Sequence, residues 1–179
     1  MYSFKKIDNK YSEIIKDLWV SSLPKNIYSI FGKGIIQIYL NYYFKQMENN
    51  AFGVFKKNKM IGFVLYGLDN KINDIILKRH FFQLFKEFIK SILKNFKNIF
   101  LYIDVILFYL FFNLINIKGA SKELLIICVD EQFTDKGIGS KLINYSINQL
   151  TKECKIIIVK TLTKNYKNIN FYKKNSFKI

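Results

Sequence analysis

The order of apolar segments beyond Ala120 restricts the fold more than any other feature of this sequence. The run ELLIICVD indicates a buried strand, and KGIGSKLINYSINQLTK has the spacing of an amphipathic helix. The stretches CKIIIVKTL and NYKNINFYKKN repeat this order as a second strand and a second helix. A strand, a helix and a strand at this spacing predict a parallel βαβ unit.

The N-terminal part predicts a strand, two helical stretches and a hairpin. MYSFKKI alternates weakly as a strand does, and the apolar residues that follow Asp8, a helix-capping type, have helical spacing. A second helical stretch covers 27–47 and is interrupted by Gly32 and Gly34. AFGVFKKNKMIGFVLYG has two apolar runs around a polar turn at Asn58, which predicts a hairpin. Together these segments predict an α/β or α+β fold with a mixed sheet.

Residues 71–117 form the unusual part of the chain. They contain an amphipathic helix pattern with a lysine face, followed by IFLYIDVILFYLFFNLINI. This second piece includes Asp104 and Asn113, and its uninterrupted apolar run is shorter than the roughly 20 residues of a bilayer span. We therefore expect a single domain, 1–179, with 71–117 as a hydrophobic helical insertion packed on the sheet. Peripheral membrane contact by the lysine-faced helix is the alternative.

The charge of the chain does not by itself identify a partner. The sequence has 29 Lys and Arg against 13 Asp and Glu, a formal net charge of +16. Only Arg79 is an arginine, and nucleic-acid readers usually depend on the planar arginine fork. We therefore interpret the lysines as a solvated surface and expect no nucleic-acid partner.

Cysteine, histidine and the N-terminal segment restrict metal content and location. Cys128 and Cys154 form no CxxC pair, and His80 is the one histidine, so no metal site is expected. The N-terminal MYSFKKIDNKYSEIIKD is charged and lacks the apolar core of a signal peptide. These features predict a cytoplasmic protein with reduced thiols.

Two glycines mark the junction between the strand and the helix after Ala120. In VDEQFTDKGIGSKLI, Gly137 and Gly139 stand where the helix begins. A helix N-terminus presents unpaired N–H groups and a positive dipole end, and glycine lets an anion approach the backbone. The pattern suits a phosphate or a pyrophosphate, or else simple tight packing. It is neither G-x-G-x-x-G nor a P-loop.

These residues resemble the acetyl-CoA motif of the GNAT superfamily of N-acetyltransferases, V-D-P-x-[YF]-[RQ]-x-x-G-x-G-[AS]-x-L-[IL]. The matching positions are Val129, Asp130, Phe133, Gly137, Gly139, Ser140, Leu142 and Ile143. NYKNINFYKKNSF is similar to the second motif of that family, N-x-x-[AS]-x-x-F-Y-x-K-x-G-F. The matching positions there are Asn165, Phe171, Tyr172, Lys174 and Phe177.

The resemblance implies an acyl-CoA acyltransferase fold of α/β (α+β) class, with a mixed, mostly antiparallel central sheet flanked by helices. Members usually continue past the position of Ile179 into a last hairpin and strand, so the sheet is expected with or without that strand. The chain departs from the motif at Thr134, where Arg or Gln is usual, and at Asp135, a negative charge near the loop. A threonine hydroxyl can still donate to a phosphate oxygen.

The resemblance also implies roles for individual residues. Tyr172 matches the tyrosine that protonates the CoA sulfur, and Glu123 is either the general base or an exposed strand-end residue. The backbone of Cys128 and Val129 should pair with the pantetheine amides as an added strand would, the Cys128 side chain being a core residue rather than a nucleophile. Asn165 either bonds the pantetheine arm or caps the last helix.

The loop itself is expected to bind the cofactor diphosphate, with Lys136 either screening its charge or serving as a solvated surface residue. The expected binding residues are Thr134, Asp135, Lys136, Gly137, Ile138, Gly139 and Ser140. The aromatic residues Tyr39, Tyr42, Tyr43 and Phe44 are expected to line an acceptor pocket or to pack in the core.

The implied function is direct transfer of an acetyl group from acetyl-CoA, as co-substrate, to the amine of a small molecule. A nucleotide-linked amino sugar of surface polysaccharide synthesis is one candidate acceptor, while O-acetylation and protein N-acetylation stay open. The alternative from another class is a truncated, non-catalytic acetyl-CoA-binding module. The protein is expected to be a monomer or a homodimer.

Overall fold

The computed structural model describes the chain in separate stretches. These are residues 1–24, 26–47, 50–67, 79, 82, 83, 85–87, 89, 90, 93, 122–150, 156–161 and 165–178. Most of the predicted insertion at 71–117 lies outside them, and so does His80. None of the helices in these stretches is both long enough and apolar enough to cross a membrane.

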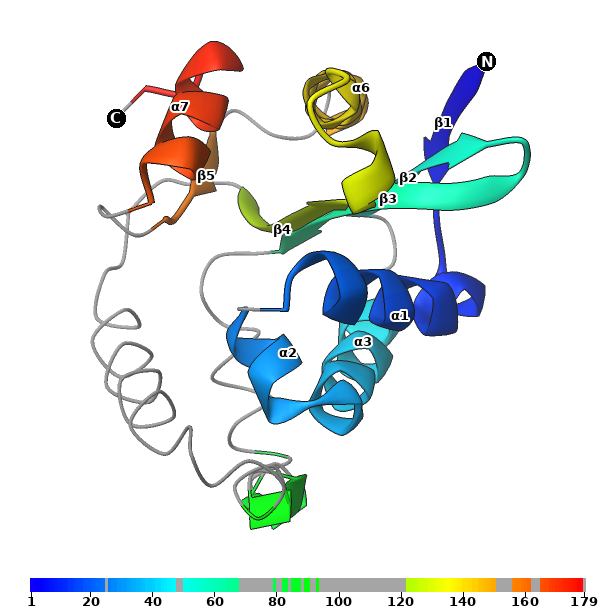
Figure 1. Ribbon diagram of the computed structural model, residues 1–179, viewed down its shortest axis with the longest axis vertical. Coiled ribbons are helices and arrows are strands. Elements are labelled where there is room, and N and C mark those ends of the chain that lie inside the picture. Colours follow the sequence, from blue (N-terminus) through cyan, green and yellow to red (C-terminus); the bar gives the residue numbers. More distant parts are fainter. Residues whose placement is uncertain are drawn as a thin grey trace.

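A five-stranded sheet forms the centre of the fold, with the strands in the order β1-β2-β3-β4-β5 (Figure 1). The strands are β1 (Tyr2–Lys6), β2 (Ala51–Lys56), β3 (Lys59–Gly67), β4 (Lys122–Val129) and β5 (Ile157–Val159). The first four pair antiparallel, and β5 is parallel to β4. This mixed, mostly antiparallel sheet confirms the predicted fold class, and the parallel pair confirms the predicted βαβ unit.

Helices cover both faces of this sheet (Figure 1). On one face lie α1 (Ser12–Ser22), α2 (Ile27–Phe31) and α3 (Lys33–Met47), and on the other lie α6 (Ile138–Leu150) and α7 (Tyr166–Lys174). Each interface has its own apolar core, because successive strand residues point to opposite faces. Burial of these two sets of side chains is the main favourable term for a fold of this kind.

The two predicted breaks in the helical stretch 27–47 have different outcomes. Gly32, with φ of 101°, ends α2 and separates it from α3, as expected. Gly34 lies inside α3, so the predicted interruption there is wrong. A Cβ at Gly34 would come within 2.5 Å of the Glu87 carboxylate, which shows that this glycine permits a close approach of a neighbouring segment.

The predicted hairpin turns where the sequence places it. Lys57 and Asn58 connect β2 to β3 with φ of 47° and 64°, both in the left-handed region. Two consecutive residues of that conformation match the right-handed twist of the flanking strands. Near Asp8, the side chain accepts a hydrogen bond from the amide of Lys10 and begins a 3-10 turn, η1 (Asn9–Tyr11), directly before α1.

A bulge interrupts the ladder between β3 and β4. Leu125 of β4 has no register partner on β3, because its two neighbours pair with consecutive residues of that strand. Tyr43 of α3 lies at this bulge: its buried hydroxyl donates to the Tyr66 carbonyl at 3.0 Å and accepts from the Tyr66 amide at 3.2 Å. One side chain therefore satisfies both backbone groups of a residue beside the irregularity.

The other residues of the aromatic cluster have a simpler role. Tyr39 and Phe44 are buried in the same core as Tyr43 and contact neighbouring rings on α1 and α3. Of the two interpretations that the sequence left open, the structure supports core packing for these three residues.

Tyr43→Phe should lower the free energy of unfolding by about 2–4 kcal/mol, because it leaves the buried amide and carbonyl of Tyr66 without this partner. Urea denaturation monitored by circular dichroism measures the loss. The matched control is Tyr42→Phe, one residue earlier on α3 and half-buried, with an expected change below about 0.5 kcal/mol. Equal losses in the two variants would contradict a special role for Tyr43.

Candidate active site

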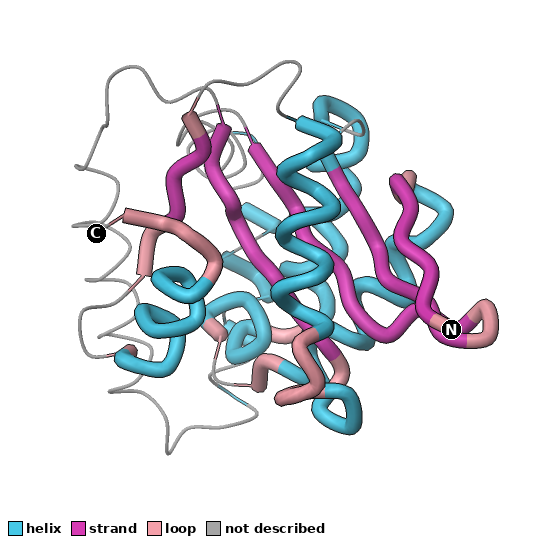
Figure 2. Tube along the Cα trace, turned by 90° about the horizontal axis from the view of Figure 1, so that it is seen from above, coloured by secondary structure: helices cyan, strands magenta, loops and turns pink. Residues whose placement is uncertain are grey.

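The strands β4 and β5 diverge after a short parallel contact. In the described sheet, β5 pairs with Lys122–Leu124 and with no later residue of β4, and Figure 2 shows the two strands separating beyond that point. On its other side β4 pairs with β3, where the Asp130 amide donates to the Ile61 carbonyl at 2.8 Å. Since bonded pairs alternate along an antiparallel ladder, the backbone groups of Ile127 and Val129 point away from β3, into the β4–β5 divergence.

The same alternation separates the two residues whose backbone was predicted to bind pantetheine. Val129 faces the divergence, whereas Cys128 directs its amide and carbonyl toward Phe63 of β3. The Cys128 side chain is buried, its sulfur lies 3.5 Å from the Leu18 carbonyl, and burial raises the pKa of the thiol to about 12. A thiol protonated at neutral pH is a poor nucleophile, which agrees with the predicted core role.

A short 3-10 turn, η4 (Glu131–Phe133), joins β4 to the glycine loop. Asp130 begins the turn, and its carboxylate accepts from the Gln132 amide at 3.0 Å. Thr134 ends the turn, and its hydroxyl donates to the Glu131 carbonyl at 2.8 Å. The proton that we expected to serve a phosphate oxygen is therefore directed back into the turn.

Glycine is favoured at positions 137 and 139 for two different physical reasons. Gly137 has φ of 70°, and no atom lies within 4 Å of a Cβ built there, so this glycine provides a left-handed backbone and open space. A Cβ at Gly139 would lie 3.3 Å from the Phe171 ring of α7, so that glycine permits tight packing. The structure supports tight packing at Gly139, while phosphate binding at Gly137 stays a prediction. Asp135 also has a positive φ, of 60°, and residues 134–137 are exposed.

The loop ends at the N-terminus of α6, where backbone donors gather. The Lys141 amide bonds to the Gly137 carbonyl at 3.1 Å and opens the helical ladder. The amides of Ile138, Gly139 and Ser140 precede it and have no acceptor within the helix. With the positive end of the helix dipole, these amides can bind an anion next to the open space at Gly137.

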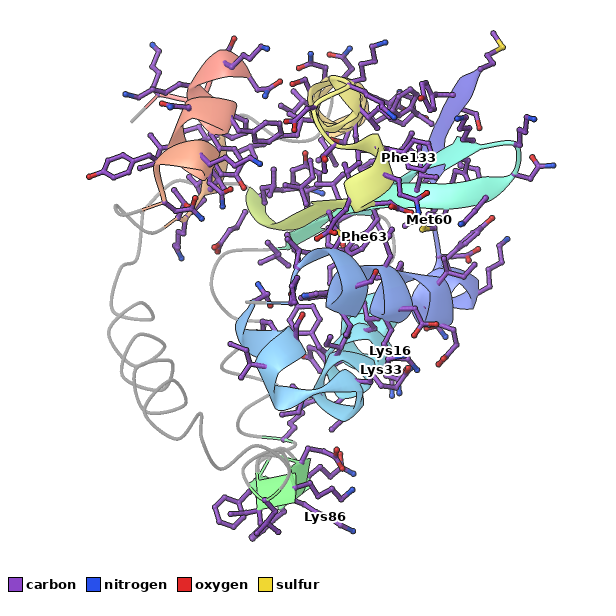
Figure 3. All side chains as sticks on the ribbon, viewed as in Figure 1. Lys16, Lys33, Met60, Phe63, Lys86 and Phe133 are labelled. Carbon is purple, nitrogen blue, oxygen red and sulfur yellow. The ribbon has the colours of Figure 1, made fainter. Side chains whose placement is uncertain are left out.

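Two lysines bring positive charge to this end of the sheet. Their ammonium groups lie near the Phe133 ring, that of Lys56 at 4.9 Å from its centroid and that of Lys136 at 5.3 Å. Figure 3 labels Phe133 beside the β2–β3 hairpin, which carries Lys56. Sequence reasoning missed Lys56, because a lysine next to a hairpin turn carries no signal of a contact 77 positions away in the chain. Lys136 also donates to the Gln132 carbonyl at 2.8 Å.

Tyr172 lies on α7 with 7% of its surface exposed. The rings of Phe171 and Phe177 contact it edge-on, at centroid distances of 5.4 and 5.6 Å. Burial raises the pKa of Tyr172 to about 12, so the phenol holds its proton at neutral pH. Asn165 accepts from the Asn168 amide at 3.2 Å and caps α7, which confirms the second of its two predicted roles.

Glu123 lies near the start of β4 and is buried, so the alternative of an exposed strand-end glutamate is wrong. Its carboxylate forms an ion pair with Lys160, just beyond β5, at 3.3 Å. Val129 lies six residues further along β4, a separation of roughly 20 Å. The structure therefore places the predicted base in the paired part of β4 and the predicted anion site at the other end of the strand, beyond the β4–β5 divergence.

Known proteins with a similar structure include acetyltransferases, the class that the two motifs resemble. The family model described as "Acetyltransferase (GNAT) domain" matches residues 101–179. PH1933 of Pyrococcus horikoshii has a similar solved structure, with a TM-score of 0.63, 19% identity and a match covering 99% of this chain and 89% of that one. The aminoglycoside N-acetyltransferase AAC(6')-Iy in complex with CoA has a TM-score of 0.61, with 12% identity and coverage of 100% and 89%.

The ribosomal-protein-S18-alanine N-acetyltransferase from Escherichia coli is similar as well, with a TM-score of 0.57, 11% identity and coverage of 97% and 76%. No curated protein matches the sequence closely. The family match and the shared fold confirm the resemblance that the two motifs indicated. Residues 101–179 thus match a GNAT acetyltransferase domain, and the chain shares its fold with solved acetyltransferases. Among the described residues, no group of three or more His, Cys, Asp or Glu side chains could hold a metal ion.

Gly137→Ala should lower the free energy of unfolding by about 1–2 kcal/mol, because alanine resists a left-handed backbone, and Gly137→Asn should cost less. Gly139→Ala should also destabilise, through its contact with the Phe171 ring. Chemical denaturation of a double-mutant cycle separates the two causes. In a Phe171→Leu background the cost of Gly139→Ala should shrink, and that of Gly137→Ala should not. Rescue of both variants would contradict the assigned causes.

Proposed function

We propose that this protein transfers an acetyl group from acetyl-CoA to an amine of a small molecule by direct attack. The observation that carries the proposal is the junction of β4 and α6. Free helix amides at Ile138–Ser140, the open space at Gly137 and the outward backbone of Val129 lie there next to the β4–β5 divergence. A diphosphate joined to an extended amide-bearing arm matches this arrangement.

The binding mode follows from these groups. The diphosphate would be held by the α6 amides, with the lysines at positions 56 and 136 adding positive charge. The pantetheine amides would pair with Ile127 and Val129, as an added strand pairs with a sheet edge. The neighbouring aminoglycoside enzyme was crystallised with CoA, which supports CoA as the ligand of this class.

The chemistry requires a base and an acid. Glu123, directly or through water, would take a proton from the acceptor amine, whose nitrogen then attacks the thioester carbonyl carbon. The C–N bond forms and the C–S bond breaks. Tyr172 would give its proton to the departing sulfur, since burial keeps the phenol protonated at neutral pH.

The acceptor is proposed to be an amino sugar. Two of the similar solved structures carry the name of an aminoglycoside N-acetyltransferase, which supports a sugar amine over other acceptors. The excess of lysine favours an anionic form, such as a nucleotide-linked amino sugar. Protein amines are the alternative, because the ribosomal-protein enzyme and the NatC complex have the same fold. We further propose that 1–179 act as one cytoplasmic domain that includes the segment 71–117.

Two measurements on the full chain test the proposal. Isothermal titration calorimetry should detect binding of CoA and of acetyl-CoA, and a thiol-release assay should detect turnover with one class in a panel of amino sugars, nucleotide-linked amino sugars and peptides. Binding without turnover for every acceptor would favour the non-catalytic module. Absence of binding to either form of the coenzyme would overturn the proposal.

Tyr172→Phe should lower turnover by about 10²–10⁴-fold, the usual contribution of general acid catalysis, while leaving the acetyl-CoA dissociation constant nearly unchanged. Tyr166→Phe, on the same helix but 72% exposed, is the matched control and should change neither. Because the pKa of Tyr172 is about 12, its phenol stays protonated between about pH 8 and 10, where an ordinary tyrosine begins to ionise. Ionisation of Tyr172 should therefore not reduce turnover of the wild type in this range. Unchanged turnover in Tyr172→Phe would remove the assignment.

A further inference from the structure

We propose that Lys160 is a positioning residue, which holds the Glu123 carboxylate at the start of the β4–β5 divergence in the ionised form that proton abstraction needs. This inference rests on the proposed function of Glu123 as the base. No family motif in the sequence includes Lys160, and its contact becomes visible only once β5 is placed beside β4.

The sheet register explains why Lys160 reaches this place. Glu123 is opposite Ile158, and the β4–β5 ladder ends one step later, at Leu124 and Val159. Lys160 is the next residue, so it stands where the two strands begin to separate. Its ammonium donates to the Glu123 carboxylate at 3.3 Å, and the two side chains are only 9% and 10% exposed.

The surroundings of Glu123 make this contact electrostatically important. Gly67, its register partner on β3, has no side chain, and Ile158 on β5 is apolar. Lys122 precedes it in β4, but consecutive strand residues point to opposite faces, and the Lys122 ammonium donates to the Asn50 side-chain oxygen. Among the described residues, Lys160 is therefore the cation in contact with this carboxylate.

A buried carboxylate is disfavoured as an ion unless a positive group compensates for lost hydration. If Lys160 supplies that compensation, its removal shifts Glu123 toward the protonated form, which cannot accept a proton from an amine. The effect should appear as a change in the pH dependence of catalysis. A purely structural ion pair would change stability and leave the pH profile of the surviving enzyme where it was.

The first test compares Lys160→Met, Lys160→Arg and the exposed control Lys167→Met in the full chain. In Lys160→Met, the acidic limb of kcat/KM should move up by about one pH unit or more, which is about a tenfold loss at a fixed pH on that limb. Acetyl-CoA affinity should not change. Lys160→Arg should restore most of the profile, and Lys167→Met should match the wild type. An unmoved limb in Lys160→Met, or Arg no better than Met, overturns the proposal.

A second test uses the Glu123→Gln background, where no buried carboxylate remains to lose its partner. Lys160→Met should cause no further loss of turnover in that background, and a further loss would overturn the positioning role. Titration of Glu123 by carboxylate NMR in wild type and Lys160→Met gives a readout without turnover, and Lys160→Arg should match the wild type. A titration indifferent to residue 160 overturns the inference even in an inactive protein, whereas failure to bind acetyl-CoA overturns only the proposed function.

Discussion

The hydrogen bonds between Tyr43 and the backbone of Tyr66 stabilise the sheet at the bulge, next to the point where β4 and β5 separate. The extra residue on β4, Leu125, disturbs the ladder beside β3, and a bulge of this kind bends its strand and increases the local twist. Tyr43 supplies both a donor and an acceptor at that point, so the irregularity leaves no orphaned group on Tyr66. Before the bulge β4 pairs with β5, and beyond it the strands diverge and expose backbone groups to the space between them.

The glycine loop depends on this arrangement. The divergence gives β4 an unpaired side, and the loop at its end turns the chain back so that α6 points its N-terminal amides toward the same region. Gly137 keeps the space in front of those amides open, while Gly139 lets the helix start pack against α7, which carries Tyr172. The strand edge, the proposed anion site and the proposed acid are thus connected by direct packing of α6 against α7.

Much of this could be predicted from the sequence, because the signals are local. The βαβ unit, the hairpin at Asn58 and the loop at Gly137 follow from periodicity and turn chemistry. The bulge could not be predicted, because the β4 segment is apolar at most positions and shows no alternation that a bulge would interrupt. The buried Glu123 contacts Lys160, 37 residues away, and a Cβ at Gly34 would meet the side chain of Glu87. Both are tertiary contacts that leave no local pattern.

Charged groups are arranged differently at the two ends of β4. At the loop, the amides that begin α6 and the ammonium groups of Lys56 and Lys136 concentrate positive charge, which favours a ligand that brings negative charge. At the other end, the buried Glu123 carboxylate already pairs with Lys160. A neutral reacting group can therefore approach it without leaving a buried charge unpaired. A co-substrate with a charged head and a long polar arm that ends in a neutral thioester matches this gradient. The proposed function therefore implies one direction for this molecule along β4, with its charged head at the loop.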